Sequence, residues 1–345
     1  MISLSVIIPV YKFARYIEGC VSSLLESTAF CDDAVGFELI LVDDGSTDGS
    51  SKLCDRLAAD PSSAGCGIKV IHQKNSGVSA ARNAGLREAS GDYVLFVDSD
   101  DTLDPRELAK LLKALDNSVD MAVFGMEFDY YAGERIYRRD IMLPSAEGVK
   151  SFDECRAMLY TLFKDNVVSS LCNKLIRRCA VEKAGAFLRE DMFLYEDLEF
   201  SLRVMAKCES FCFVREPIYR YRQAADEGNA GRRLKRIAHI TDVVDNIEAA
   251  LEPFGGSDDI LLSLYLVLAR EKISCASREE TDTVCGDFRA WIDAHGLLEK
   301  LRGREYGMLL YEKRSAKLLA KRRVSAARHK LAVAVKKTFG DFRKR

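Results

Sequence analysis

The sequence predicts an α/β protein with a mostly parallel sheet and flanking helices, followed by a helical C-terminal region. Two observations predict this class. Short β-branched or apolar runs alternate with segments of helical apolar spacing through the first third of the chain, which is typical of βαβ units. After residue 228, apolar side chains recur at three- and four-residue steps and predict a helix with one buried face. The runs are Leu4–Pro9, Leu39–Asp43, Ile68–Ile71, Tyr93–Asp98 and Met121–Phe124, and the helical stripe is Leu234, Ile237, Thr241, Val244, Ile247 and Leu251.

The first run is predicted to be a strand and not a signal peptide, because "MISLSVIIPVYKF" lacks a basic start, a long apolar core and a small-residue cleavage site. The helix after the fourth strand is expected to begin with Asp104 as N-cap, Pro105 at the first position and Glu107 completing a capping box. Further helices are expected over Asp153–Phe163 and around Glu196–Ala206.

Composition excludes disordered, collagen-like and membrane-spanning chains. Of the 345 residues 48% are hydrophobic, Gly numbers 22 and Pro 6. The longest apolar run, Ile260–Ala269, is about half of the roughly 20 residues that a bilayer crossing needs, so a buried helix is expected. Eleven cysteines without a CxxC pair predict reduced thiols and a cytoplasmic location.

Acidic residues follow two predicted strands. "DSDD" places Asp98, Asp100 and Asp101 where the fourth strand ends, and carboxylate oxygens suit a hard divalent cation such as Mg²⁺ or Mn²⁺. Asp43 and Asp44 follow the second strand, where they could accept hydrogen bonds from a ribose or a base. Ligands of such sheets bind beyond the carboxyl ends of the strands. The alternative is that these residues only solvate turns and cap helices.

Two further segments carry candidate site residues. "NSGVSAARNAGL" opens a helix with a glycine and places Arg82 on it, where a guanidinium favours phosphate or forms a surface ion pair. In "YEDLEFSLR", Glu196 and Asp197 begin a helix. An anionic carboxylate there could take a proton from an acceptor hydroxyl, or it could simply complement the helix dipole.

Together these pieces resemble the inverting glycosyltransferases of family 2, which have the GT-A fold, and in particular those that build capsules and exopolysaccharides. The resemblance covers residues 2–225. It rests on five ordered matches: "SVIIPVYKFARYIEGCVSSLLES", "ELILVDDGSTDGS", "VIHQKNSGVSAARNAGLREASGDYVLFVDSDD", "NKLIRR" and "YEDLEF". Two stretches depart from the family pattern. Cys172 stands where many relatives carry an aromatic residue, and "AADEGNAG" replaces a Gly-Ser loop after "YRYRQ".

The resemblance implies roles for particular residues. It assigns Asp197 as the general base, with Glu196 as its neighbour near the acceptor. Asp100 is the expected direct ligand of Mn²⁺ or Mg²⁺, with Asp98 and Asp101 as further ligands. The residues expected to bind the nucleotide-sugar are Pro9, Tyr11, Asp43, Asp44, Arg82, Asp98, Lys174 and Arg222. The implied reaction moves a sugar from a nucleotide-sugar, most often a UDP-sugar, to a hydroxyl of a glycan or lipid-linked acceptor, with inversion and without a covalent intermediate.

The resemblance implies a nucleotide-sugar-binding half over 1–125 and an acceptor-binding and catalytic-base half over 126–228. Apolar spacing and charge predict a helical domain over 229–310 and a basic tail over 311–345. A sugar-nucleotide pyrophosphorylase is disfavoured, because its Gly-rich basic loop is replaced by "PVYKFARY". A degenerate relative acting as a membrane-associated scaffold or partner subunit is the alternative, and Asp100 and Asp197 speak against it.

The net charge of −2 hides two opposed parts. Residues 311–345 hold 13 Lys and Arg against two acids, a charge of +11, so residues 1–310 carry −13. Leu331, Val335, Phe339 and Phe342 would form an apolar stripe on a basic helix. This pattern predicts peripheral attachment to the anionic inner face of the cell membrane. A helix packed on the body is the alternative, and nucleic acid is not expected as a partner.

Overall fold

The structure, a computed structural model, describes residues 2–30, 35–60, 66–115, 118–224, 240–255, 258–312 and 317–318. The chain divides into two compact units. The first comprises Met1–Glu227 and Ala250–Gly255, and the second Gly228–Ala249 and Gly256–Arg345. The predicted stripe positions Leu234 and Ile237 and nearly all of the basic tail lie outside the described residues.

Ten strands of the described residues form one sheet in the first unit. They are β1 (Ile2–Val10), β2 (Val35–Asp43), β3 (Gly67–His72), β4 (Tyr93–Phe96), β5 (Thr102–Leu103), β6 (Met121–Ala132), β7 (Arg135–Met142), β8 (Gly148–Ser151), β9 (Lys174–Arg177) and β10 (Ser210–Ala224). The order is β3-β2-β1-β4-β9-β6-β10-β5, with β7 on β6 and β8 on β10. β1 to β4 are parallel, as are β6 and β10, whereas β9 runs antiparallel between β4 and β6.

The predicted α/β class with a mostly parallel sheet is confirmed, and the five predicted runs correspond to β1, β2, β3, β4 and β6. The antiparallel strands were not predicted. Two of them, β5 and β9, span only two and four residues, too few to show a period, and the exposed hairpin strand β7 is rich in charge.

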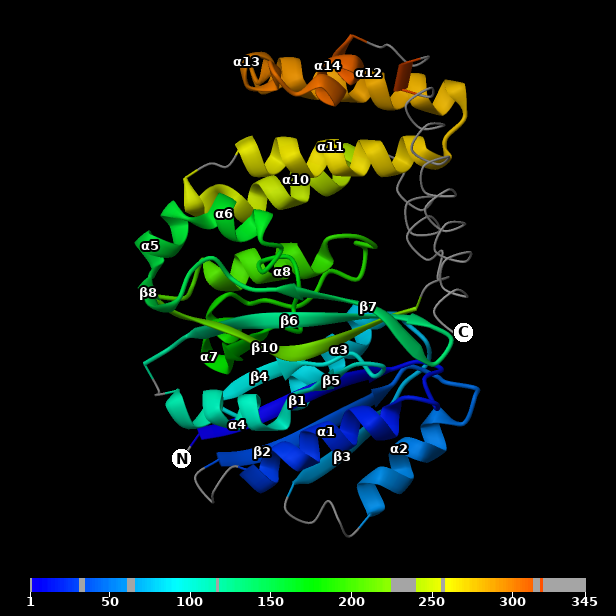
Figure 1. Cartoon of the computed structure of the whole chain (residues 1–345), viewed down its shortest axis with the longest axis vertical. Coiled ribbons are helices and arrows are strands. Elements are labelled where there is room, and N and C mark those ends of the chain that lie inside the picture. Colours follow the sequence, from blue (N-terminus) through cyan, green and yellow to red (C-terminus); the bar gives the residue numbers. More distant parts are fainter. Residues whose placement is uncertain are drawn as a thin grey trace, which may run out of the picture. The chain divides into compact units, whose positions relative to one another are not determined.

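The helices of the first unit flank this sheet (Figure 1). They are α1 (Ile17–Phe30), α2 (Ser50–Ala59), α3 (Val78–Glu88), α4 (Pro105–Ala114), α5 (Phe152–Ala157), α6 (Leu159–Lys164), α7 (Arg178–Lys183) and α8 (Glu196–Met205). Asp104 caps α4 by accepting from the backbone N–H groups of Arg106 and Glu107, as predicted. The expected capping box does not form, because the Glu107 carboxylate pairs with Lys110 at 2.6 Å. The expected helix over 153–163 is two short helices that meet at Met158.

The central strand β1 is buried on both faces. Its side chains Leu4, Val6 and Ile8 share a core with residues of α1 and α4. On the other face Ile7 meets α3 at Gly85, where an added Cβ would lie 2.3 Å from Ile7 Cγ2. α3 therefore lies directly on the strand, a close approach that a side chain at position 85 would prevent. This contact fixes α3 relative to the edge at which β1 ends.

The second unit is helical in its described part, with α10 (Ile240–Leu251, whose last two residues belong to the first unit), α11 (Asp258–Cys275), α12 (Arg278–Ala294), α13 (Leu298–Leu301) and α14 (Glu305–Tyr311). Val244, Ile247 and Leu251 of the predicted stripe are buried. The run Ile260–Ala269 lies in α11 and is largely buried, as expected. Among the helices that the structure describes, none combines the length and apolar character needed to cross a bilayer.

Candidate active site

The carboxyl ends of β1, β2 and β4 meet at one edge of the sheet. The parallel register pairs Val10 with Asp43 and Ile7 with Phe96, so the segments that follow these strands lie side by side. Backbone bonds continue past the strand ends, from Asp44 N–H to the Val10 carbonyl at 2.8 Å and from Val97 N–H to the Ile7 carbonyl at 3.0 Å. The turn after β2 and the "DSDD" turn after β4 therefore flank the same position, as the topology of parallel strands requires.

Asp43 is buried and holds the turn that follows it. Its carboxylate accepts from Ser46 N–H at 3.0 Å, Ser51 Oγ at 2.6 Å and His72 Nδ1 at 3.0 Å. Burial raises the pKa of Asp43, but the hydrogen bonds outweigh it and the pKa lies below its usual value. Asp43 is thus an anion at neutral pH, and its carboxylate is already hydrogen-bonded within the protein.

Asp44 is buried beside Asp43 and connects β2 to α3. It accepts from Gln73 Nε2 at 2.8 Å and from the backbone N–H groups of Ser76 and Gly77 at 2.8 and 2.9 Å. These N–H groups precede the first turn of α3, where a negative charge is stabilising. The two acidic residues therefore lie at the predicted edge of the sheet, where their carboxylates hold the backbone of the site in place.

Arg82 bridges the "DSDD" turn and the start of α8. Its side chain is 5% exposed, and Nη2 donates to Asp98 Oδ1 at 2.8 Å while Nη1 donates to Asp197 Oδ1 at 2.9 Å. The buried Nε has no hydrogen-bond partner among the described residues. Because the Arg82 side chain is buried, the alternative that it forms an ion pair on the protein surface is excluded. Three candidate residues from separate segments are in direct contact.

Asp197 stands at the start of α8, after a residue with unusual backbone geometry. Tyr195 has φ of 61°, a left-handed conformation that is uncommon for a residue with a side chain, and it directly precedes Glu196. The Asp197 side chain is 26% exposed. Burial, together with the negative charges of Glu196 and Asp98, raises the pKa of Asp197 to about 6, against the opposing effect of Arg82. Asp197 is therefore an anion at neutral pH with the proton affinity of a competent base.

Asp101 does not fit a metal. It is 2% exposed, and its two oxygens accept from Tyr219 Oη and Arg222 N–H, both at 2.6 Å. Burial and the charges of Asp98 and Asp100 raise its pKa well above the usual value. The expectation that Asp101 is a metal ligand is therefore not supported: its carboxylate fastens the "DSDD" turn to β10.

Asp98 and Asp100 suit a divalent cation by their chemistry. Both are partly exposed carboxylates at the sheet edge, and Mg²⁺ or Mn²⁺ bound by one or two carboxylates completes its shell with phosphate oxygens. No group of three or more His, Cys, Asp or Glu side chains within the described ranges is arranged to hold a metal. These two residues therefore fit a metal that arrives with a phosphate-bearing ligand.

Lys174 is near enough to Asp197 for their charges to interact, but its ammonium group is bound within its own loop. It is fully buried, and Nζ donates to the Val167 carbonyl at 2.7 Å, to the Ser170 carbonyl and to Asn173 Oδ1 at 2.9 Å. Burial lowers the pKa of Lys174 to about 7. Three oxygen atoms accept hydrogen bonds from the Lys174 ammonium group. Lys174 therefore holds the loop before β9 together and is not placed to orient a diphosphate.

The remaining predicted residues border the edge. Pro9 is buried in β1, and Tyr11 just beyond it is 41% exposed, with Lys12 over its ring. The Arg222 guanidinium lies between two aromatic rings, 3.6 Å from the Tyr131 centroid and 4.6 Å from that of Tyr16. Arg222 is thus held by cation–π contacts, which sequence spacing did not show.

Two structural residues were missed by the sequence analysis. Tyr219 Oη accepts from Asp98 N–H at 3.1 Å and donates to Asp101, so it joins both ends of the "DSDD" turn. Asn83 follows Arg82 and binds the segment before α8. The alternation of "YRYRQ" was a signal for Tyr219, since it places Tyr219 and Tyr221 on one face of a strand. No spacing indicated the partner of Asn83.

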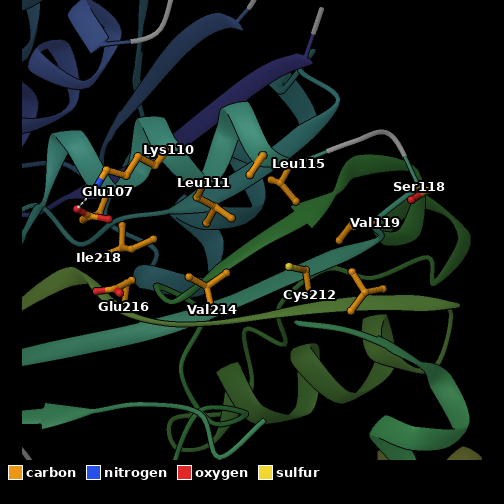
Figure 2. Close-up of a pocket in the computed structure, with 12 residues that line it drawn as sticks. Glu107, Lys110, Leu111, Leu115, Ser118, Val119, Cys212, Val214, Glu216 and Ile218 are labelled. Atoms are coloured by element: carbon orange, nitrogen blue, oxygen red, sulfur yellow. Dashed lines mark hydrogen bonds and ion pairs between the residues drawn. The ribbon is translucent and has the colours of Figure 1, made fainter. Parts of the chain in front are cut away.

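A separate pocket lies away from this edge, between α4 and β10 (Figure 2). Its volume is about 430 Å³, and its lining is mainly apolar, including Leu111, Leu115, Val214 and Ile218. None of the predicted site residues lines it. The candidate active site is therefore the carboxylate-rich sheet edge.

The mixed sheet, with acidic residues at the carboxyl ends of its parallel strands, is the architecture of GT-A glycosyltransferases. The chain belongs to glycosyl transferase family 2, whose family model matches residues 5–185. It is 29% identical over 222 residues to the putative glycosyltransferase EpsH of Bacillus subtilis strain 168, which covers 64% of this chain and 60% of that protein. The chain thus spans less than two thirds of this relative.

Solved structures share the fold. The structure of S. aureus TarS 1–349 in complex with UDP-GlcNAc has a TM-score of 0.62 at 18% identity and covers 94% of this chain and 92% of that one. The mannosyltransferase PcManGT of Pyrobaculum calidifontis, in complex with GDP-Man and Mn²⁺, has a TM-score of 0.50 at 19% identity, covering 96% and 86%. At these identities the likeness shows the GT-A fold.

Proposed function

We propose that this protein transfers a sugar from a nucleotide-sugar, of the UDP class, to a hydroxyl of a glycan or lipid-linked acceptor in cell-surface polysaccharide synthesis. The contact of Arg82 with both Asp98 and Asp197 carries the proposal, because it brings a cation-binding carboxylate and a candidate base to one buried arginine. Family 2 membership, the resemblance to EpsH and the UDP-GlcNAc complex of TarS support it.

The donor would bind across the ends of β1 and β2. Pro9 and Tyr11 border the base pocket, and Asp43 and Asp44 supply carboxylates for a ribose or a base edge. Each carboxylate oxygen has two lone pairs, and Asp43 Oδ1 and Asp44 Oδ2 each accept one hydrogen bond from the protein, so each of these two oxygens can accept one more. The buried Nε–H of Arg82 has no hydrogen-bond partner among the described residues, which costs free energy. An anionic oxygen of the donor that accepted from this group would remove the cost.

The diphosphate would lie over Asp98 and Asp100, with Mn²⁺ or Mg²⁺ bound by these carboxylates. The metal would supply Lewis-acid neutralisation of the leaving-group charge. The Mn²⁺ complex of PcManGT supports this choice of metal for a protein of the same fold. Asp101 and Tyr219 keep the turn that carries both ligands in place.

Asp197 would take the proton of the acceptor hydroxyl as the oxygen attacks the anomeric carbon, on the face opposite the leaving nucleotide. The bond to the nucleotide breaks as the bond to the acceptor forms, so the anomeric configuration inverts. A pKa of about 6 leaves the carboxylate ionised at neutral pH and able to accept the proton. Glu196, which is 8% exposed, is adjacent and raises that pKa.

Attachment to the inner face of the cell membrane through residues 311–345 belongs to the same proposal and rests on their charge of +11. It would bring a body of charge −13 to a lipid-linked acceptor despite the repulsion of an anionic surface.

The test is a panel of UDP- and GDP-sugars, each assayed for hydrolysis and transfer with and without Mn²⁺. We expect Mn²⁺-dependent turnover of a UDP-sugar that Asp197→Asn and Asp100→Ala each reduce by about 100-fold or more. A protein that binds no nucleotide-sugar in a thermal-shift assay, or that is inactive both before and after these substitutions, would instead be the scaffold alternative. Transfer that survives both substitutions would show that Asp100 and Asp197 do not have the proposed roles.

A further inference from the structure

A buried amide on α3 holds the segment that leads into the candidate base. This segment, residues 184–195, connects α7 to α8, and Leu188 lies in its middle with 2% exposure. Asn83, also 2% exposed, donates from Nδ2 to the Leu188 carbonyl at 2.9 Å and accepts at Oδ1 from the Leu188 N–H at 2.8 Å. The side-chain amide thus pairs with both backbone groups of one residue, as a neighbouring strand would.

Asn83 Nδ2 also donates to Glu190 Oε1 at 3.1 Å. Because the oxygen and the nitrogen of the amide are both required, a carboxylate or an apolar side chain at position 83 leaves buried backbone groups of Leu188 without a partner. The pairing joins residues 105 positions apart in the chain.

Asn83 can act as a fixed point because α3 itself is anchored at two places. Asp44 binds the N–H groups before its first turn, and Gly85 allows its backbone to lie directly on Ile7 of β1. The helix is therefore fixed to the two strands whose ends form the donor side. A residue that α3 binds is therefore fixed in position relative to the donor side of the site.

The segment is held from α8 as well. Arg203 donates from Nη2 to the Phe187 carbonyl at 2.5 Å, and its guanidinium is fixed by two bonds to Glu199 at 2.7 and 3.0 Å. The backbone at 187 and 188 is thus bound on one side by α8 and on the other by α3. The exposed rings of Phe187 and Phe193 project from a segment that is pinned at its centre.

The pinned segment ends in a conformation that its sequence does not favour. Tyr195 has φ of 61°, and a left-handed residue with a side chain persists only where its surroundings hold it. Glu196 and Asp197 follow immediately, so release of the segment would let the start of α8 relax. Arg82, the neighbour of Asn83 on α3, holds the Asp197 carboxylate itself.

We propose that Asn83 is a positioning residue for the base: its paired hydrogen bonds with Leu188 set the path of residues 184–195 and hence the place of Asp197 relative to the donor. This role rests on the proposed function of Asp197. The Asn83 side chain is buried and its amide is bound to Leu188 and Glu190, so its proposed action on transfer is indirect. Its effect is on the alignment of the base with the sugar, where a misplacement of about 1 Å is enough to cost about 100-fold in rate.

The experiment compares Asn83→Ala with Glu190→Ala, which removes the third hydrogen bond and leaves Leu188 paired. For Asn83→Ala we expect kcat for transfer to fall about 10- to 100-fold, UDP-sugar affinity to stay within about twofold of wild type, and amide hydrogen exchange in peptides covering 186–197 to accelerate. Glu190→Ala should stay within about twofold in all three measurements. Asn83→Asp, which keeps the size and one acceptor oxygen, replaces Asn83→Ala if the latter does not fold.

Unchanged exchange in 186–197, or a loss of donor affinity that equals the loss of kcat, would overturn the proposal, because either result means that Asn83 does not act through this segment. Transfer that is unaffected while exchange accelerates would overturn it as well. If the wild-type protein shows no transfer, the proposed function fails by itself, and the exchange measurement still decides whether Asn83 holds the segment.

Discussion

Arg82 Nη1 lies 2.9 Å from Oδ1 of Asp197, and the arginine side chain in this ion pair is 5% exposed. The same guanidinium binds Asp98 through Nη2. One guanidinium thus forms ion pairs with a candidate metal ligand and a candidate base. Burial and the charges of Glu196 and Asp98 raise the pKa of Asp197, whereas the charges of Arg82 and Lys174 lower it.

This balance predicts the pH dependence of transfer. The base must be ionised, so kcat should fall with decreasing pH through an apparent pKa of about 6. Arg82→Gln removes the stabilising charge and should move this acidic limb to higher pH, whereas Glu196→Gln removes a repulsive charge and should move it to lower pH. Initial rates between about pH 4.5 and 8.5 measure the limb. Asp197→Asn should lose about 10²- to 10⁴-fold well above the pKa of Asp197, and this difference from wild type should shrink at low pH, where the wild-type base is protonated.

Shifts of the same sign in the two variants would contradict this assignment, because one substitution removes a positive and the other a negative charge beside the same carboxylate. Glu196→Gln is the matched control for general disturbance of the site.

Asp100 and Asp101 should separate in their effects although they are adjacent. Asp101→Asn leaves one of two buried donors, Tyr219 Oη or Arg222 N–H, without an acceptor and should destabilise the fold by about 1–3 kcal/mol. Asp100→Ala should abolish the stabilisation that Mn²⁺ adds to nucleotide-sugar binding. Thermal unfolding with and without UDP-sugar and Mn²⁺ measures both. A stable Asp101→Asn protein that has lost Mn²⁺ dependence would restore Asp101 as a ligand.

The difference between these two aspartates shows what the sequence could and could not predict. The motif "DSDD" after a β-branched run was enough to place the carboxylates at the sheet edge, because parallel strands end on one side. Their individual roles depend on Tyr219, which is 118 residues from Asp101 and reaches it only through the pairing of β10 with β5 and β6. Local spacing carries no information about such a partner.

Lys174 illustrates the same limit. Its place in "NKL" predicted a role at the diphosphate, yet its ammonium group is bound by the carbonyls of its own loop. The burial of Lys174 follows from β9, a four-residue strand that runs antiparallel between β4 and β6. Unlike β4, which is equally short but wholly apolar, β9 has a charged residue at each end, so neither the strand nor the burial of its first residue could be predicted.

His72 should contribute stability that depends on pH. Its Nδ1 and Nε2 each lie 3.0 Å from a carboxylate oxygen, of Asp43 and Asp55, and these hydrogen bonds raise its pKa. A pKa raised by folding stabilises the protein fully below the unfolded value of about 6.5, and this contribution is lost as pH rises through the folded value. His72→Asn should therefore lower the melting temperature more at about pH 5.5 than at about pH 9.

The control for His72 is Asp55→Asn, which removes one of the two charges and should reduce the same pH dependence. Equal loss of melting temperature at both pH values in His72→Asn would show that the imidazole contributes through packing and not through its charge.

The basic tail should make membrane binding sensitive to salt. A chain without residues 313–345 is expected to lose its binding to anionic liposomes in sedimentation assays, because the remaining body is acidic. Binding of the full chain should fall sharply at about 1 M salt, where the screening length is about 3 Å. Phe339→Ala with Phe342→Ala should weaken binding while keeping the charge. Undiminished binding by the truncated protein would show that the attachment lies elsewhere.

Gly85→Ala should destabilise the first unit by about 1–3 kcal/mol, because a Cβ at this position would lie 2.3 Å from Ile7 Cγ2 and would push α3 off β1. Gly19→Ala in α1 is the matched control: nothing lies within 4 Å of its Cβ position, and alanine in a helix should stabilise by about 0.5–1 kcal/mol. Urea unfolding measures both. Since α3 carries Arg82, Gly85→Ala should also reduce transfer in protein that is still folded. Equal stability of the two variants would mean that α3 does not pack directly against β1 at Gly85.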